Sequence, residues 1–195
     1  MVSRCGATAQ ILVKAALNVG SQLGFGHVIA DQLHLCIVVT QQVRGAEPKL
    51  TPAVEIILLV VGPTQVDYAK AGLADFAQRI NHYAKFRTES VRDRAAQHAF
   101  LKPGDLLVLL DERGQHLKSV ELAQRLQKWM NSGPKRILFA VGDAYGFSAE
   151  FRAQAQYELA LSKMTFPHDL VRVLFAEQLY RALSILRNEP YHHEG

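Results

Sequence analysis

The sequence predicts an α/β domain in which a parallel sheet is covered by helices. Three continuous apolar runs, EIILLVVG (55–62), DLLVLLDE (105–112) and RILFAVGD (136–143), are bounded by glycine, proline or charge. Runs of this kind are typical of strands buried on both faces, as in a parallel sheet. Helical patterns lie between them, and alternation of strands with helices indicates the α/β class. The 195 residues, 49% apolar and 21% charged, suit one globular domain.

The helices between the runs are predicted from apolar residues at three- and four-residue spacing. They are expected at 66–83, 91–101, 119–130 and 148–161. Ser119 and Ser148 are plausible N-caps, because a serine hydroxyl accepts a hydrogen bond from a free backbone N–H.

The last helix is expected from Leu170 to Leu186 and is apolar on more than one side. Glu177 and Arg181 form a favourable pair on its remaining polar surface. A helix too apolar for one sheet face suggests a second partner, and the same helix of another subunit would serve.

Residues 1–53 differ in character from the rest, with no Asp or Glu before Asp31. A short helix over 10–23 and a short strand over 33–39 are weak patterns, and GAEPKLTP (45–52) reads as a linker. A secretory signal is weakly supported, because Lys14 interrupts the apolar run, and an amphipathic, arginine-containing transit segment is a second weak interpretation.

Several classes of site lack their sequence signatures. The two cysteines, Cys5 and Cys36, have neither zinc-type nor CxxC spacing, so a reducing, cytoplasmic setting is the default. No HExxH, GxGxxG, GxSxG, GKS or GKT motif occurs, and the apolar runs are too short to span a membrane. The net charge of +4 and the pI near 9.1 are compatible with an RNA partner without requiring one.

Two of the strands end in residues that could line a ligand site. The run at 105–112 continues into Arg113 and Gly114, and the run at 136–143 continues to Gly146. Ligands of open parallel sheets bind beyond the carboxyl ends of the strands, where glycines let the backbone approach closely. On the pattern alone, a tight strand-to-helix turn is the favoured explanation of Gly142 and Gly146.

A third feature is the stretch SKMTFPHDLVRV (162–173), which precedes the last helix. Pro167 is tolerated in a first helical turn, so a capped entry with a buried Phe166 would account for it. His168 alone is more often structural than catalytic, and paired histidines at a chain end usually belong to a solvated tail.

Together these segments resemble one family. Four segments follow one another along the chain: ILLVVG, LLVLLDERG, a glycine turn after FAVG, and LSKMTFPHDLVRVLFAEQLYRALSILRNEPYHHE. In this order they resemble the ribosomal RNA large-subunit methyltransferase H family of the SPOUT class, over about 54–194. That family methylates N3 of a pseudouridine in 23S rRNA. The resemblance implies a carboxyl-terminal trefoil knot, a homodimer, S-adenosylmethionine as methyl donor, and no metal. The alternatives are a non-catalytic RNA- or ribosome-binding relative and a SPOUT enzyme with another RNA target.

The resemblance also assigns roles to residues. His168 and His192 are candidates to accept the N3 proton, Tyr191 to position or stack on the base, and Arg172 and Arg181 to contact RNA phosphates. The residues expected to line the cofactor pocket are Leu110, Gly142, Gly146, Leu161, Ser162, Lys163, Met164, Thr165 and Phe166.

Three features depart from the family pattern. Asp143 stands where a second glycine is usual, so its carboxylate is expected to crowd or charge the pocket. The segment 86–101 is short, and its strand and following loop are expected to be partly deleted. Residues 1–53 have no counterpart, so we divide the chain into an extension of unknown role (1–53) and a SPOUT domain (54–195). Val54 occupies the place of the family's initiator methionine, and the native start is expected near it.

Overall fold

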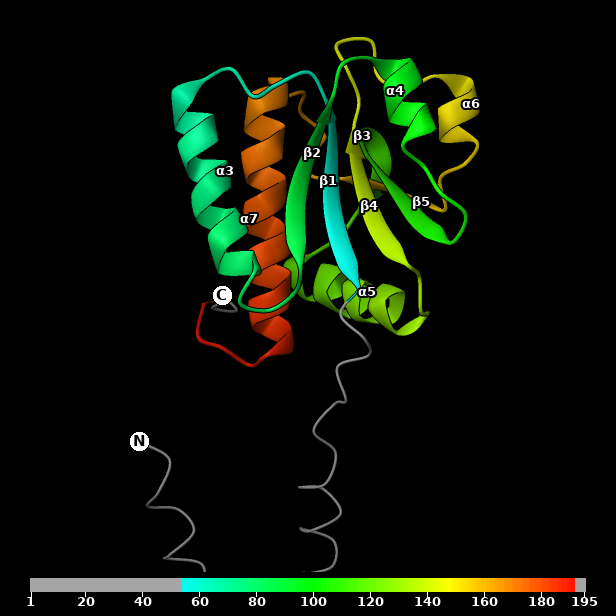
Figure 1. Cartoon of the computed structure of the whole chain (residues 1–195). Coiled ribbons are helices and arrows are strands. Elements are labelled where there is room, and N and C mark those ends of the chain that lie inside the picture. Colours follow the sequence, from blue (N-terminus) through cyan, green and yellow to red (C-terminus); the bar gives the residue numbers. More distant parts are fainter. Residues whose placement is uncertain (1–53, 192–195) are drawn as a thin grey trace, which may run out of the picture. The chain divides into compact units, whose positions relative to one another are not determined.

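A computed structural model describes residues 54–191 of the chain, which form one parallel sheet with helices on both faces (Figure 1). The strand order is β2-β1-β4-β3-β5, and every pair is parallel. The strands are β1 (Glu55–Val61), β2 (Phe86–Val91), β3 (Asp105–His116), β4 (Arg136–Val141) and β5 (Tyr157–Ala160). The predicted α/β class is confirmed. The knot stays a prediction, and residues 1–53 lie outside the described part.

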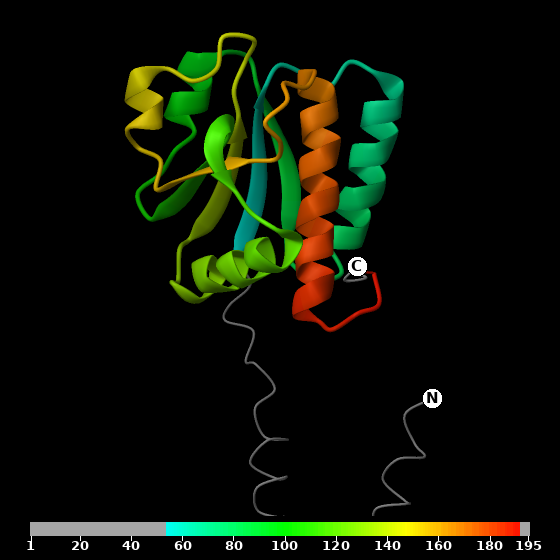
Figure 2. The same ribbon diagram turned by 180° about the vertical axis from the view of Figure 1, so that it is seen from behind.

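The helices divide between the two faces of the sheet (Figures 1 and 2). They are α3 (Asp67–Ile80), α4 (Arg94–Ala99), α5 (Ser119–Asn131), α6 (Ala149–Arg152) and α7 (His168–Leu186). Core residues of α3, α5 and α7 share one apolar cluster, whereas Phe151 of α6 belongs to the cluster on the opposite face. In Figure 2 the orange segment that follows β5 leads to the beginning of α7.

The central strands are buried on both sides, as their continuous apolar runs predicted. In β1, Ile56 and Leu58 face the cluster of α3, α5 and α7, while Ile57 and Leu59 face the other cluster, and all four are fully buried. This alternation follows from the two-residue period of a strand. It explains why no polar residue interrupts the run.

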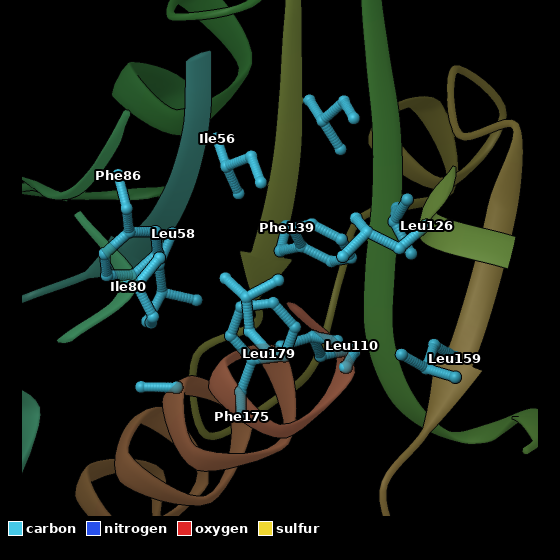
Figure 3. Close-up of a cluster of buried hydrophobic side chains, with 14 of the residues drawn as sticks. Ile56, Leu58, Ile80, Phe86, Leu110, Leu126, Phe139, Leu159, Phe175 and Leu179 are labelled. Atoms are coloured by element: carbon cyan, nitrogen blue, oxygen red, sulfur yellow. The ribbon is translucent and has the colours of Figure 1, made fainter. Parts of the chain in front are cut away.

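The long helix α7 packs directly against the sheet and against α3. The ring centroids of Phe139 in β4 and Phe175 in α7 are 4.5 Å apart at the centre of the cluster (Figure 3). A Cβ added to Gly72 of α3 would lie 3.1 Å from Cγ1 of Val173, so the absence of a side chain allows the two helices to approach closely. α7 begins at His168, two residues before the predicted start.

The helix predicted over 148–161 is wrong in its second half. The helix α6 ends at Arg152, and residues 157–160 form the edge strand β5 instead. The reason is pairing with β3: the N–H and carbonyl of Leu107 contact the side-chain Oε1 and the backbone N–H of Gln156, at 2.7 and 3.0 Å. Non-local pairing here outweighs local helix propensity.

The segment 86–101 is better formed than the sequence suggested. β2 pairs with β1 at all six of its residues, so this strand is not lost. The helix predicted over 91–101 is shorter in the structure, because α4 starts after Asp93, whose carboxylate accepts a hydrogen bond from the N–H of Ala96 at 2.8 Å.

Candidate functional site

A cavity of about 470 Å³ opens beyond the carboxyl end of β4 and beside residues 110–113 of β3, where β3 stops pairing with β4. The glycine turn 142–146 lies on one side of it and the segment 161–166 on another. Of the residues predicted for this site, those that line the cavity are Leu110, Gly142, Gly146, Leu161, Ser162, Met164, Thr165, Phe166 and His168. Lys163 is not among its lining residues. The structure therefore brings together most of the predicted pocket, in the place where parallel sheets bind ligands.

The glycine turn needs both of its glycines. A Cβ on Gly142 would lie 2.9 Å from the carbonyl carbon of Gly146 and 3.0 Å from its Cα, closer than real Cβ atoms approach backbone. Gly146 has φ +76°, a conformation that L side chains rarely adopt. The N–H of Gly146 donates to the carbonyl of Asp143 at 2.9 Å and closes the turn. The two interpretations of these glycines are compatible: the turn is tight, and it also lines the cavity.

Asp143 does not leave an unpaired charge in the pocket. Its Oδ2 accepts from Nε of Arg94 at 2.6 Å, and its Oδ1 accepts from the backbone N–H of Tyr145 at 2.8 Å. The hydrogen bond from Arg94 is the main cause that lowers the pKa of Asp143, so the carboxylate is ionised and paired. Asp143 is also not among the residues with positive φ, so the replacement of glycine does not strain the backbone here.

The segment 161–166 is held by hydrogen bonds of its own. The hydroxyl of Thr165 donates to Oε2 of Glu112 at 2.9 Å, which ties the segment to the extended end of β3. The N–H of Met164 donates to Oγ of Ser162 at 3.0 Å. Met164 lines the cavity but is 71% exposed, so the described part of the chain leaves its outer side uncovered.

Asp111 is a buried carboxylate at the cavity that sequence reasoning did not single out. It accepts from the backbone N–H of Arg113 at 3.0 Å and from the guanidinium of Arg152 at 2.5 Å. Burial alone would raise its pKa, but the hydrogen bonds from Arg113 and Arg152 outweigh it and lower the pKa to about 2. The only signal in the sequence was its position at a strand end, in DERG.

His168 is the first residue of α7, is exposed, and lines the cavity. The next residue fixes its place: the carboxylate of Asp169 accepts hydrogen bonds from the N–H groups of Gln65 at 2.8 Å and Val66 at 2.9 Å. The bond from Val66 is the main cause that lowers the pKa of Asp169. The start of α7 is thereby tied to the loop before α3.

Arg172 is not placed to contact a phosphate. Its residue is 3% exposed, and its guanidinium donates to Oγ1 of Thr64 at 2.8 Å and to the carbonyl of Val61 at 3.0 Å. This placement contradicts the expected phosphate contact and makes Arg172 a structural residue. The sequence could not reveal this, because its partners lie 108 and 111 residues away.

Arg181 and Tyr191 lie at the other end of α7 and do not line the cavity. Arg181 pairs with Glu177 at 2.6 Å, and its guanidinium carbon lies 4.8 Å from the ring centroid of Tyr191. At 1.5 Å per residue, Arg181 is about 20 Å from His168 along the helix axis. One chain therefore does not bring Arg181 or Tyr191 to the cavity. His192 lies outside the described residues.

The described part of the chain holds neither a cluster of metal ligands nor a membrane-spanning helix. Among residues 54–191, no three His, Cys, Asp or Glu side chains are grouped so as to hold a metal ion. Within the same range, no helix has both the length and the apolar character needed to cross a bilayer.

The family model and the known proteins that match this sequence are all described as methyltransferases. The family model described as predicted SPOUT methyltransferase matches residues 54–192. The ribosomal RNA large subunit methyltransferase H of Parabacteroides distasonis is 40% identical over 72% of this chain and 99% of its own length. The protein of the same name from Geobacter sp. strain M21 is 41% identical over 70% of this chain and 97% of its own.

Among solved structures, a probable methyltransferase from Bordetella pertussis is similar with a TM-score of 0.45 and 12% identity, covering 67% of this chain and 96% of that one. The family model and the two sequence relatives establish the family without it. This chain belongs to the SPOUT methyltransferase family.

Proposed function

We propose that this protein transfers a methyl group from S-adenosylmethionine to large-subunit ribosomal RNA, at N3 of a pseudouridine. The observation that carries the proposal is the cavity in which the glycine turn 142–146, the segment 161–166 and His168 meet. The relatives named ribosomal RNA large subunit methyltransferase H support the choice of substrate.

The residues of the cavity fit an adenosine-containing cofactor. A volume of about 470 Å³ lies within the range of small-molecule sites. Leu110, Leu161 and Phe166 supply apolar walls, while the glycine turn offers backbone groups that no Cβ covers. The cofactor supplies an electrophilic methyl group.

The charges at the cavity suit a reaction in which a sulfonium loses its positive charge. Asp111 and Asp143 are the carboxylates buried deepest in its wall, and each is paired with an arginine. An unpaired anion would stabilise the charged ground state more than the transition state, and would therefore slow the transfer. Paired carboxylates shape the wall without that penalty.

The acceptor nitrogen must be aligned with the methyl group and must lose its proton. Alignment contributes much of the rate of an in-line displacement. Histidine is a common general base in enzymes, so His168, which lines the cavity, is a suitable proton acceptor, and His192 is the second candidate. Tyr191 would stack on or position the base, and Arg181 would contact a phosphate.

These roles require a homodimer, because His168 and Tyr191 lie at opposite ends of α7. In a twofold dimer with antiparallel α7 helices, the tail of each chain would reach the cavity of the other. The composition of α7 is consistent with such packing: every residue of its last five turns, 170–186, is buried or half-buried, and Leu174 is among the half-buried ones. We further propose a knotted carboxyl-terminal segment and a cytoplasmic location, as the family resemblance implies.

Binding and nucleoside analysis test the proposal together. The full chain should bind S-adenosylmethionine in calorimetry, and ribosomes from a deletion strain should lack one methylated pseudouridine that the purified protein restores. Restoration of a different methylated nucleoside would indicate a SPOUT enzyme with another RNA target. If the chain neither binds S-adenosylmethionine nor methylates the ribosomes, it is a non-catalytic RNA- or ribosome-binding relative. Replacing both His168 and His192 by Ala should abolish transfer while cofactor binding persists; undiminished transfer would remove both from the mechanism.

A further inference from the structure

The short helix α4 lies in the segment 86–101, which was expected to be partly deleted. Two of its side chains form hydrogen bonds to residues 141 and 143, at the start of the glycine turn 142–146. Gln97 is 3% exposed, and its Nε2 donates to the carbonyl of Val141 at 3.0 Å. Arg94, one helical turn earlier, donates from Nε and Nη2 to the two oxygens of Asp143 at 2.6 and 2.5 Å. These contacts hold the residues on either side of Gly142, the position where the turn closes most tightly.

The carboxylate of Asp143 is the centre of this arrangement. It accepts both hydrogen bonds of the Arg94 fork and a third from the backbone N–H of Tyr145 at 2.8 Å. The guanidinium carbon of Arg94 also lies 5.8 Å from the ring centroid of Tyr145, within the range of a cation–π contact. A bidentate fork fixes orientation as well as charge. Residues 143–145 are thereby held from outside the turn.

The sequence supplies the reason for such a contact. By the family resemblance, Asp143 stands where a second glycine is expected, and its carboxylate adds an anion to the wall of a pocket for a cationic sulfonium. Without a partner, that anion would attract the sulfonium and would be free to turn into the cavity. Arg94 comes from 49 residues away and balances this charge.

We propose that Arg94 is a positioning residue of the cofactor pocket, which acts through Asp143 to hold the turn 142–146 and to keep the pocket wall neutral. This proposal rests on the proposed function, because it takes the cavity to be the cofactor site. It makes α4 part of the binding apparatus rather than a surface element. An ordinary surface ion pair would affect stability slightly and cofactor choice not at all.

The test compares S-adenosylmethionine, which carries the positive sulfur, with S-adenosylhomocysteine, which is neutral there. Arg94→Ala loosens the turn and should weaken both ligands, by roughly threefold to tenfold for the neutral one. The freed Asp143 carboxylate attracts only the sulfonium, so the ratio of the Kd of S-adenosylmethionine to that of S-adenosylhomocysteine should fall about threefold.

Asp143→Asn should raise the ratio of the Kd of S-adenosylmethionine to that of S-adenosylhomocysteine. The Asn side chain retains an oxygen that can accept from the Tyr145 N–H, but Arg94 is left as an unpaired cation that repels the sulfonium. In the double variant Arg94→Ala, Asp143→Asn both charges are gone, and the ratio should return to the wild-type value. If Arg94 served stability alone, this ratio of Kd values would be unchanged in all three variants.

Arg92→Ala is the matched control, since it removes the same charge two residues away, and the Arg92 side chain is 86% exposed and paired with Asp93. Its Kd values should equal those of the wild type. Should Arg94→Ala fail to fold, Asp143→Asn and Arg94→Lys decide the question, because Lys restores the charge but not the fork. Lys should keep the wild-type ratio with weaker binding of both ligands.

Calorimetry on the full chain gives these constants, and melting curves check the fold of each variant. An unchanged ratio in Arg94→Ala or Asp143→Asn, or a double variant whose ratio stays away from the wild-type value, would overturn the role of Arg94. Absence of binding of either ligand to the wild type would instead overturn the proposed function, and this inference with it.

Discussion

Replacing Arg172 by Met tests whether this arginine serves the fold rather than the RNA. In the structure the guanidinium donates to Thr64 and to the carbonyl of Val61, and it lies 3.4 Å from the carboxylate of Asp169. These contacts join α7 to the end of β1 and the following loop. Met retains much of the aliphatic volume, so the substitution removes the charge and the hydrogen bonds while limiting the cavity that is left.

The magnitude follows from those contacts. Two hydrogen bonds from a charged donor contribute about 1.5–3 kcal/mol each when their half-buried acceptors are left without a partner. Against this, desolvation of the native arginine costs free energy and lowers its pKa, and its Nε has no partner among residues 54–191. We expect a net loss of about 3 kcal/mol in the free energy of unfolding, and a drop in Tm of roughly 6–12 °C for a domain of this size.

Urea unfolding followed by circular dichroism measures this loss, with Arg181→Met as the control. Arg181 pairs with Glu177 within one helix, and such a pair contributes less than about 1 kcal/mol. If Arg172→Met were as stable as Arg181→Met and lost only RNA methylation, the assignment of Arg172 to the fold would be refuted, and the phosphate contact predicted from the sequence would be restored.

Three other substitutions follow from the site. Gly142→Ala should weaken cofactor binding in calorimetry at least about tenfold, because its Cβ would displace the backbone of Gly146; unchanged binding would mean that the turn adapts. The pKa of Asp111 falls from 3.8 to about 2 on folding, so its stabilisation is complete above about pH 5 and is lost as the pH falls toward 2; it amounts to about 2 kcal/mol and should vanish in Asp111→Asn, whose acid unfolding should lack that component. Tyr83→Phe removes the hydroxyl bonded to Glu189 and should speed proteolysis at the carboxyl-terminal tail, while the Tm changes by less than about 4 °C; an unchanged cleavage rate would show that this bond does not hold the tail.

The sequence was sufficient to predict the centre of the sheet. β1, β3 and β4 are buried on both faces, and only continuous apolar runs satisfy that requirement. The edge was harder to predict. The four residues of β5 have no apolar run of their own, and their strand conformation comes from pairing with β3 across a register shift between Leu110 and Gln115. Pattern analysis within a short window does not contain that pairing.

The candidate site also contains residues that the sequence could predict and residues whose roles it could not. The cavity residues were predictable because parallel strands place their carboxyl ends together, and because the resemblance matched motifs at those ends. The roles of the arginines were not. Arg94 and Arg172 are both arginines on helices, yet one is paired with a residue of the pocket turn and the other is buried beside β1. Only the three-dimensional partners distinguish them.

Because His168 and Tyr191 are separated along α7, the site that we propose needs two chains. If His168 is the proton acceptor and each cavity takes its tail from the partner chain, homodimers of His168→Ala and of Tyr191→Ala should both be inactive, but a mixture of the two chains should regain activity. Random exchange makes half the dimers mixed, and each mixed dimer has one intact site, so about a quarter of the wild-type rate should return. Co-refolding the two variants and measuring methyl transfer gives this fraction. No recovery, with dimers present by light scattering, would place both residues at a site within one chain and would require the tail to fold back along its own helix.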